Sequence, residues 1–339
     1  MEGSTLNLHR LVELGYAFRS AKVLMSAVEL GVFTALGQGP ADGDTLQRRL
    51  GLDNRGARDF FDALVALDLL QRDNQGYYSN SPETDFYLDR QKASYVGGFV
   101  ENLNAREYGM WASLTDALRT GKPQTGFDAK AHYDALYSDP ARLDFFVRAM
   151  TGWTLPVAKA IASKFSWRDY STVIDIGTAQ GALPTEIARA HAHIAGGGFD
   201  LPPLQPLFER FVAAHDLAAR LRFHPGDFFS DPLPTADVLV MGRVLHNWDL
   251  VTKRMLLRKA YDALPAGGAL VVYERLIDND RREAFGLLSS LNMLIMTAGG
   301  FDFTAADCIG WMREAGFSDT HVEPLVAGQS MIVATKCKR

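Results

Sequence analysis

The stretch STVIDIGTAQGALPTEIARAHAHIAGGGFD, from Ser171 to Asp200, contains two strand-like segments with a helix-like segment between them. STVIDIG and IAGGGFD are short apolar runs, as buried strands are, while LPTEIARAHA has the length and spacing of a helix. A strand, a helix and a second strand in this order predict one unit of a parallel sheet.

The same alternation continues toward the end of the chain. Further strands are predicted in LRFHPGD, ADVLVMG and GGALVVYE, and further helices in LQPLFERFVAAH and LVTKRMLLRKAYDAL. This pattern predicts an α/β fold with a Rossmann-like, doubly wound and mostly parallel sheet that has helices on both faces. The last segment, HVEPLVAGQSMIVATK, contains two β-rich runs around AGQS, which predict a C-terminal antiparallel hairpin.

The N-terminal part of the chain differs, because helical patterns dominate it. Apolar residues at roughly helical spacing predict a helix from residue 8 to about 36, and the composition of Gly37–Asp44 predicts a loop. A short helix, a turn at Gly51, a second helix from Arg55 to Leu67 and a hairpin in RDNQGYYS then outline a winged helix. The second helix carries acidic as well as basic residues, which favours a dimerisation module over a DNA-binding one.

Composition limits the classes of protein to which the chain can belong. It has 339 residues, of which 47% are hydrophobic and 22% are charged, and this suits two globular domains. The net charge of −5 disfavours a nucleic-acid partner, because such proteins carry a basic face. The longest apolar stretch, Phe285–Gly300, is too short for a membrane span, and the N-terminus lacks the apolar core of a signal peptide. Two cysteines, Cys308 and Cys337, fit a reducing compartment, so we expect a cytoplasmic protein.

Ligands of a doubly wound sheet bind beyond the carboxyl ends of its strands, so the residues at those ends matter most. The first strand leads through Asp175 and Gly177 into a turn that ends at Gly181, and glycines there let the backbone approach a nucleotide closely. Asp200 follows Gly181 by 19 residues, and a carboxylate in that position accepts hydrogen bonds from ribose hydroxyls. The third glycine of a pyrophosphate site and a Walker-type lysine are missing, so a nucleoside without phosphates fits better than NAD or ATP.

Three later strand ends carry polar residues of another kind. After the third strand, GDFF supplies Asp227 and Phe228, a carboxylate and a flat ring that suit an adenine. The fourth strand leads into VLHNWD with His246, the fifth ends at Glu274, and Asp302 follows in the loop TAGGFDF. A single histidine at a strand end is more often structural than catalytic, but two carboxylates at neighbouring strand ends favour a histidine that handles protons.

The most specific segments, in chain order, are GFDLP, GDFF, VLHNWD, DALPAGGALVVYE and SLNMLIMTAGG. In sequence, order and spacing they resemble the S-adenosylmethionine (SAM)-dependent O-methyltransferases of the plant caffeic acid and animal acetylserotonin type, which have many bacterial relatives acting on natural products. The resemblance runs over nearly the whole chain and implies a homodimer. It also implies a winged-helix-like dimerisation domain over residues 1–100, linking helices over 101–170 and a SAM-binding catalytic domain over 171–339.

The resemblance implies roles for individual residues. His246 matches the general base that takes the proton from a substrate hydroxyl, and Glu274 and Asp302 match the acidic residues that flank and orient it. The residues that match the SAM site are Trp153, Asp175, Gly177, Asp200, Leu201, Asp227, Phe228 and Arg243. Those expected at the substrate are Met150, Asn247, Asn292, Met293 and Met296. For Met150 and Met293 a place in the core is an equal expectation, and no metal is expected in the site.

Several positions depart from the family pattern. The turn from Asp175 to Gly181 has Thr178 and Ala179 where the family commonly has glycines, which narrows the approach to the cofactor. Phe301 and Phe303 replace the polar and charged residues that are usual beside the second acid. The more apolar loop favours a flat acceptor, so we expect methylation of a phenolic or enolic hydroxyl of an aromatic small molecule.

Three other functions remain open at this stage. An enzyme of the same fold could use the cofactor for decarboxylation, hydroxylation or a pericyclic reaction. A carboxyl methyltransferase would need no base, because a carboxylate acceptor is already ionised. A winged-helix regulator with a small-molecule domain would bind a ligand without turning it over.

Overall fold

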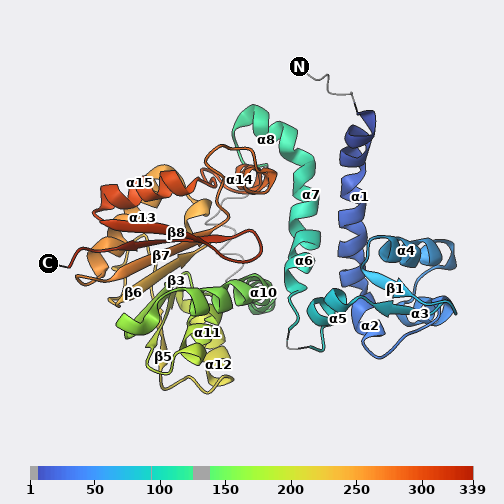
Figure 1. Cartoon of the computed structure of the whole chain (residues 1–339), viewed down its shortest axis with the longest axis horizontal. Coiled ribbons are helices and arrows are strands. Elements are labelled where there is room, and N and C mark those ends of the chain that lie inside the picture. The colour runs from blue at the N-terminus through green and yellow to red at the C-terminus, as the bar shows by residue number, and fades with distance from the viewer. Residues whose placement is uncertain (1–6, 93, 125–137, 339) are drawn as a thin grey trace. The chain divides into compact units, whose positions relative to one another are not determined.

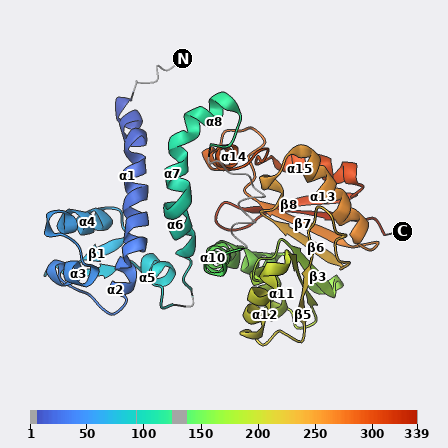
Figure 2. The same cartoon turned by 180° about the vertical axis from the view of Figure 1, so that it is seen from behind.

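The computed structural model describes residues 7–92, 94–124 and 138–338 of the chain. The chain forms two compact units, an N-terminal one of Met1–Gly109 and a C-terminal one of Met110–Arg339. Figures 1 and 2 show the elements of each unit from two opposite sides. Among the described residues, no helix has both the length and the apolar character needed to cross a membrane.

The N-terminal unit is helical apart from one small hairpin. Its elements are α1 (Leu8–Leu30), α2 (Val32–Leu36), α3 (Gly43–Leu50), α4 (Asn54–Ala66), β1 (Leu70–Arg72), β2 (Tyr78–Asn80), α5 (Pro82–Leu88) and α6 (Gly98–Asn102). A π-helical turn over Leu103–Glu107 and the short α7 (Tyr108–Met110) follow at the boundary between the units. β1 and β2 pair antiparallel, so α3, α4 and this hairpin have the predicted winged-helix outline.

The first helix ends earlier than the sequence pattern predicted. One helix was expected from residue 8 to about 36, but the helix stops at Gly31, which has a φ of 76°. The N–H of Gly31 donates to the carbonyl groups of Ala27 and Val28, a C-cap that glycine adopts without strain. The short helix α2 then begins, and its Val32 and Phe33 are buried in the core of this unit.

The C-terminal unit contains the predicted doubly wound sheet, with the strand order β5-β4-β3-β6-β7-β9-β8. In chain order its strands are β3 (Thr172–Ile176), β4 (Ala195–Asp200), β5 (Leu221–Pro225), β6 (Val238–Gly242), β7 (Ala269–Glu274), β8 (Asp319–Pro324) and β9 (Ser330–Thr335). The strands from β3 to β7 pair in parallel, whereas β9 is antiparallel to both β7 and β8, which confirms the C-terminal hairpin. The order of the strands reverses between β3 and β6, and sheets of this kind bind ligands above such a reversal.

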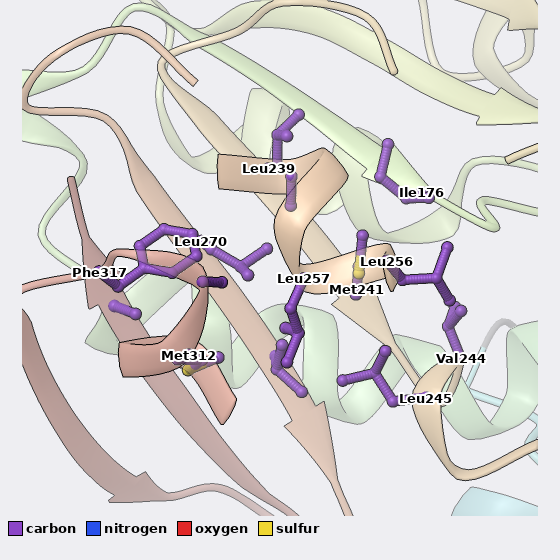
Figure 3. Packing of buried hydrophobic residues seen from close by; sticks show 14 of the residues in the cluster. Ile176, Leu239, Met241, Val244, Leu245, Leu256, Leu257, Leu270, Met312 and Phe317 are labelled. Atoms are coloured by element: carbon purple, nitrogen blue, oxygen red, sulfur yellow. The ribbon is translucent and has the colours of Figure 1, made fainter. Parts of the chain in front are cut away.

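Helices cover both faces of this sheet. The described α-helices of this unit are α8 (Leu114–Thr120), α10 (Pro140–Lys164), α11 (Ala182–Ala190), α12 (Gln205–Ala213), α13 (Leu250–Ala263), α14 (Ala284–Met296) and α15 (Ala305–Ala315). On one face, Leu256 of α13 and Met312 of α15 belong to the same buried cluster as Leu239 and Met241 of β6 (Figure 3). On the other face, Val240 of the same strand joins a cluster with residues of α10 and α11. Alternate residues of β6 therefore face opposite helical layers, and both faces of the strand are buried.

The turn between β3 and α11 accommodates its non-glycine residues by means of the neighbouring strand. Gly177 and Ala179 have φ values of 77° and 50°, while the side chain of Thr178 is buried. A Cβ atom added to Gly198 of β4 would lie 2.2 Å from the Cγ2 atom of Thr178. Thr178 is thus accommodated because the residue opposite it, Gly198, has no side chain.

Replacing Gly198 by alanine should therefore destabilise the protein by about 1–3 kcal/mol, because the new methyl group overlaps a buried side chain. The double variant Thr178→Gly/Gly198→Ala should recover most of this loss, since it removes the overlapping group. Urea denaturation followed by circular dichroism measures the free energy of unfolding. Gly310→Ala on α15, where an added Cβ meets nothing within 4 Å, is the control and should be neutral or stabilising. Equal losses in the single and the double variant would contradict the explanation.

Candidate active site

A hydrogen bond joins the ends of two adjacent parallel strands, β6 and β7. β6 leads into a 3₁₀ turn, Leu245–Asn247, which carries His246, and β7 ends at Glu274. The Nδ1 atom of His246 lies 2.7 Å from the Oε2 atom of Glu274. The backbone N–H of His246 also donates to Oε1 of the same carboxylate, over 3.3 Å. The two side chains are only 7% and 1% exposed, so this contact is shielded from water.

This contact determines which nitrogen of the imidazole carries the proton. A carboxylate only accepts hydrogen bonds, so the contact with Glu274 requires a proton on Nδ1 of His246. In the neutral ring, Nε2 then has a free lone pair, which is the form that a general base needs. The negative charge of Glu274 also favours the imidazolium ion that forms when Nε2 takes up a proton.

Asp302 approaches the same imidazole from a loop. Its Oδ1 atom lies 3.9 Å from Nδ1 of His246, which is too long for a hydrogen bond but allows electrostatic attraction. Gly300 permits the approach, since a Cβ atom there would lie 2.6 Å from the carbonyl oxygen of His246. Burial raises the pKa of Asp302; His246 opposes the increase and Glu274 adds to it. Glu274 is therefore the direct partner of the ring, and Asp302 acts on it through space.

The same three side chains have ligand atoms within 4.8 Å of one another, the one group among the described residues that could hold a metal ion. Bonds to such an ion are about 2.0–2.2 Å long, so two of its ligands are normally about 3 Å or more apart. The 2.7 Å between His246 and Glu274 is a hydrogen-bond distance. The geometry therefore favours proton handling over metal binding.

Two acidic residues lie at the ends of β3 and β4. Asp200 accepts hydrogen bonds from the backbone N–H groups of Ala179, at 2.9 Å, and Leu201, at 2.8 Å. Asp175 is buried in β3, two residues before Gly177. Burial raises the pKa of Asp200 to about 6 and, with a contribution from the charge of Asp200, that of Asp175 to about 8. The carboxylate of Asp200 has lone pairs left after these two bonds, so it fits the ribose hydroxyls of a nucleoside.

The GDFF turn after β5 presents an aromatic surface. Phe228 and Phe229 lie edge-on to Trp248, with ring centroids 5.9 Å and 4.8 Å from it. Asp227 accepts a hydrogen bond from the backbone N–H of Phe229 at 2.9 Å, so one of its oxygens stabilises the turn itself. The sequence patterns assigned no role to Trp248, whose indole nitrogen is buried with no hydrogen-bond partner among the described residues.

Trp153 and Arg243, two of the residues predicted at the cofactor, lie close together. Arg243 directly follows β6 and has a φ of 55°, which is uncommon for a residue with a side chain and is often found at functional sites. Its guanidinium carbon lies 5.6 Å from the ring centroid of Trp153 in α10, and that of Arg275 lies 4.7 Å from the same ring. Met150 is half-buried one turn earlier on α10.

The predicted substrate residues on α14 occupy different environments. The Oδ1 atom of Asn292 accepts a hydrogen bond from the indole nitrogen of Trp111 at 2.9 Å, and its amide nitrogen lies 3.2 Å from the sulfur of Met296. Met293 is buried, with 6% exposed, whereas Met296 is half-buried. The amide of Asn247 donates to carbonyl groups within its own turn, so part of its hydrogen-bonding capacity serves the backbone.

Lys253 is a second residue near the site that the sequence patterns did not single out. It lies on α13, fully buried, with 0% exposed. The buried residues of this helix are Lys253, Leu256, Leu257 and Ala260, a spacing that identifies one face of a helix. This spacing can be read from the sequence, and it places Lys253 on the same helix face as the buried leucines.

Comparison with known proteins identifies the family. Residues 111–318 match the O-methyltransferase domain, and residues 12–90 match the O-methyltransferase dimerisation domain. The chain belongs to the O-methyltransferase family. It is an enzyme of the SAM-dependent methyltransferase class, EC 2.1.1.

Two bacterial relatives of this methyltransferase match it over almost their whole length. It is 39% identical over 327 residues to the tetracenomycin polyketide synthesis 8-O-methyl transferase TcmO of Streptomyces glaucescens, covering 96% of each chain. It is 38% identical over 332 residues to the N,N-dimethyltransferase OxyT of Streptomyces rimosus, again covering 96% of each. Among solved structures, human N-acetylserotonin methyltransferase in complex with SAM matches with a TM-score of 0.90 and 28% identity over 100% of both chains.

The raised pKa values of Asp175 and Asp200 predict opposite pH dependences for stability and for cofactor binding. In the unfolded chain both acids lose their protons near the usual pKa of 3.8. In the folded, ligand-free enzyme they keep these protons up to a pH of about 6 for Asp200 and about 8 for Asp175. Their contribution to stability is therefore complete below 3.8 and is lost as the pH rises through about 6 and about 8. Ribose hydroxyls bind best to an ionised carboxylate, so affinity for S-adenosylhomocysteine should increase over the same range.

Isothermal titration calorimetry of S-adenosylhomocysteine from about pH 5 to about pH 9, in two buffers with different ionisation enthalpies, measures this linkage. We expect proton release on binding and an affinity that increases with pH. Asp200→Asn, which has no titratable group, should bind more weakly and lose the part of the pH dependence near 6. If the affinity of the unmodified enzyme stayed constant between about pH 5 and about pH 9, the predicted role of Asp200 as the ligand of the ribose hydroxyls would be refuted.

Proposed function

We propose that this methyltransferase transfers a methyl group from SAM to a phenolic or enolic hydroxyl of an aromatic small molecule, with His246 as the general base. The observation that supports it best is the 2.7 Å hydrogen bond between His246 and Glu274, which orients the imidazole and leaves Nε2 able to accept a proton. Membership of the O-methyltransferase family supports the reaction type.

SAM supplies a methyl group that is already activated on a sulfonium sulfur, so the protein need not form a covalent intermediate. The chain has to align the acceptor oxygen, exclude water and remove one proton. His246 takes that proton on Nε2 as the oxygen becomes nucleophilic, and Glu274 stabilises the resulting imidazolium through Nδ1–H. A positioned base of this kind contributes about 10²–10⁴-fold to the rate. Asp302 adds a second negative charge that favours the same ion.

For the cofactor, we assign the ribose hydroxyls to Asp200, whose carboxylate is held by two backbone N–H groups. Asp227 and Phe228 are assigned to the edge and the face of the adenine, beside the ring of Trp248. The other proposed SAM contacts are Trp153, Asp175, Gly177, Leu201 and Arg243. The proximity of the Trp153 ring to the Arg243 guanidinium supports placing both in one pocket.

For the acceptor, we propose a flat, polycyclic phenol of the aromatic polyketide type. The name of the relative TcmO, which is 39% identical to this chain, refers to the synthesis of a polyketide, tetracenomycin. The proposed acceptor-binding residues are Met150, Asn247, Asn292, Met293 and Met296. The contact between the amide of Asn292 and the sulfur of Met296 combines a polar group with a polarisable one, as small-molecule pockets commonly do.

A second candidate reaction is methylation of an amine. The observation that favours it is the 38% identity to a relative named as an N,N-dimethyltransferase. An amine that is neutral when it reacts also loses one proton in the process, so His246 could serve in both cases. The two candidates therefore differ in the acceptor atom and share the base.

Transfer of an isotopically labelled methyl group from SAM to a panel of polycyclic phenols, with amine and carboxyl analogues, tests the proposal. Label on a phenolic oxygen is expected, and His246→Ala should lower kcat by about 10²-fold or more while Kd for S-adenosylhomocysteine changes little. His321→Ala, an exposed histidine on β8, is the matched control and should keep full turnover. Label on nitrogen would support the second candidate. Full turnover of His246→Ala with a carboxyl acceptor would sink the role of the base, and cofactor binding without transfer to any acceptor would sink methylation.

We also propose a homodimer, formed through residues 1–100, with 171–339 as the catalytic domain and 101–170 as its linking helices. The match to a dimerisation domain supports it. So does α1, whose exposed apolar residues include Leu8, Leu11, Val12, Leu14, Tyr16 and Phe18. A groove of about 500 Å³ between α1 and α4, lined mainly by apolar side chains, adds to this surface. Apolar surface of this extent is typical of an oligomer interface.

Leu11 and Leu14 are 66% and 74% exposed, so replacing both by aspartate should disrupt association without affecting a core. We expect size-exclusion chromatography with light scattering to give the mass of two chains for the unmodified protein and of one chain for the double variant. Val251→Asp, at a 77% exposed position on α13, is the control and should stay dimeric. A single-chain mass for the unmodified protein at micromolar concentration would refute the homodimer.

The state of the cysteines supports a cytoplasmic location, which we propose as well. Cys308 is buried and Cys337 is exposed, and both are free thiols. Burial raises the pKa of the Cys308 thiol, so it stays protonated and unreactive. Free thiols persist in a reducing compartment.

A further inference from the structure

A lysine ammonium group is buried next to the proposed base. Lys253 has 0% of its surface exposed and lies on the inward face of α13, where its neighbours are Leu256 and Leu257. An ammonium ion loses its hydration when it is buried, and this destabilises a fold unless other groups compensate. An apolar residue at this position would be more stabilising, so the charge calls for a specific explanation.

The contacts of Lys253 connect two functional loops. Its Nζ atom donates to the carbonyl oxygen of Trp248 at 2.5 Å, and Trp248 follows His246 by two residues. The same atom lies 3.3 Å from the ring centroid of Phe301 and 5.6 Å from that of Phe303. These two phenylalanines flank the second acid of the site, and a cation over an aromatic face is attracted to it. One side chain thus joins the turn that carries the base to the loop that carries the acid.

Lys253 also interacts electrostatically with the acids of the site. Burial lowers the pKa of Lys253 to about 8, so the group is still charged near neutral pH. The groups around it that oppose this decrease are, largest effect first, Glu274, Asp302, Asp249 and Cys308. The two strongest are the carboxylates beside His246, so the Lys253 ammonium faces this buried acid pair. The guanidinium of Arg243 is a second positive charge that acts on Asp302.

We propose that Lys253 is a positioning residue whose buried ammonium group keeps Glu274 and Asp302 ionised beside a neutral His246. The inference rests on the proposed function, in which His246 is the base. Two buried carboxylates near one another share a proton readily, because like charges repel strongly where water is excluded. A proton on either carboxyl group weakens the electrostatic stabilisation of the imidazolium ion. A proton on Nε2 of His246 occupies the lone pair that the base needs.

The charge of the site during the reaction follows from this arrangement. With Lys253 charged, the two carboxylates, the ammonium and the neutral imidazole carry one net negative charge before proton transfer. They carry none after His246 has taken the proton. Without the ammonium these groups would carry two net negative charges before the reaction. As the pH falls, one of them would then take up a proton from solvent at a higher pH than in the unmodified enzyme.

Three variants separate charge, hydrogen bond and packing. Lys253→Met has a similar length and no charge, and Lys253→Gln has no charge but keeps an N–H donor for the carbonyl group of Trp248. Arg254→Met is the matched control, because it removes a charge of the same sign from the next position of α13, where the side chain is 48% exposed and pairs with Glu314. For each variant we would measure kcat, KM, melting temperature and the pH dependence of kcat/KM.

Both Lys253 variants should move the acidic limb of kcat/KM upward by about one pH unit, which lowers kcat/KM by about tenfold at pH values on that limb. The melting temperature of Lys253→Met should be unchanged or higher, because an unhydrated charge has been removed from the core. KM for the acceptor should change little, and Arg254→Met should match the unmodified enzyme. A merely structural lysine would instead lower the melting temperature and leave the acidic limb in place.

A readout without turnover separates this inference from the proposed function. In protein labelled with ¹³C at its histidine rings, the signal that disappears in His246→Ala reports the protonation of His246. Its midpoint should move upward by about one pH unit in Lys253→Met, whether or not an acceptor has been found. An unchanged midpoint and acidic limb in Lys253→Met and Lys253→Gln would overturn the inference, even if methyl transfer is confirmed. A shifted midpoint in an enzyme that fails to methylate would overturn the proposed function alone.

Discussion

The hydrogen bond between His246 and Glu274 depends on the register of β6 and β7. Gly242 pairs with Tyr273 in the parallel ladder, so the strand with Glu274 ends where the chain after β6 turns toward it. The N–H of Arg243 donates to the carbonyl oxygen of Tyr273 at 3.0 Å, which extends the pairing by one residue. A slip by one residue would move the carboxylate to the opposite face of the sheet. The packing of helices on both faces of β6 opposes such a slip, because each face of the strand has its own buried partners. Figure 3 shows the partners on one of these faces.

Buried acids occur in both the proposed cofactor site and the proposed base site, and the two pairs differ in which group compensates their negative charge. At the cofactor end, burial dominates and raises the pKa of Asp200 to about 6 and that of Asp175 to about 8. Hydrogen-bond donors of a bound nucleoside would then favour ionisation. At the base, the balancing charge is part of the chain, because Lys253 faces Glu274 and Asp302. Under the proposed assignment, the first pair would respond to a bound nucleoside, whereas the second pair already has Lys253 beside it in the ligand-free protein.

The sequence patterns predicted the features that follow from local periodicity. Alternating strands and helices predicted the parallel sheet, and the rule that parallel strands end at one edge brought His246 and Glu274 together. The distance of Asp302 from the imidazole could not be predicted, because it depends on how the loop that carries Asp302 packs against the turn that carries His246. The break of the first helix at Gly31 was missed because apolar spacing continues through it. The contacts of Lys253 were missed because they come from segments that only tertiary packing unites.

The altered glycine turn shows how a close approach can be kept when its glycines are lost. The backbone of a turn next to a ligand needs space. This space can come from glycines in the turn itself or from a glycine in the segment that packs against the turn. Here Thr178 is accommodated over Gly198, so the neighbouring N–H of Ala179 still reaches the carboxylate of Asp200 at 2.9 Å. The requirement for glycine has moved from the turn to β4, a strand that contains three consecutive glycines. Such a strand has few side chains to pack, so its position is set mainly by its backbone pairing with β3 and β5, and the placement of Asp200 depends on that pairing.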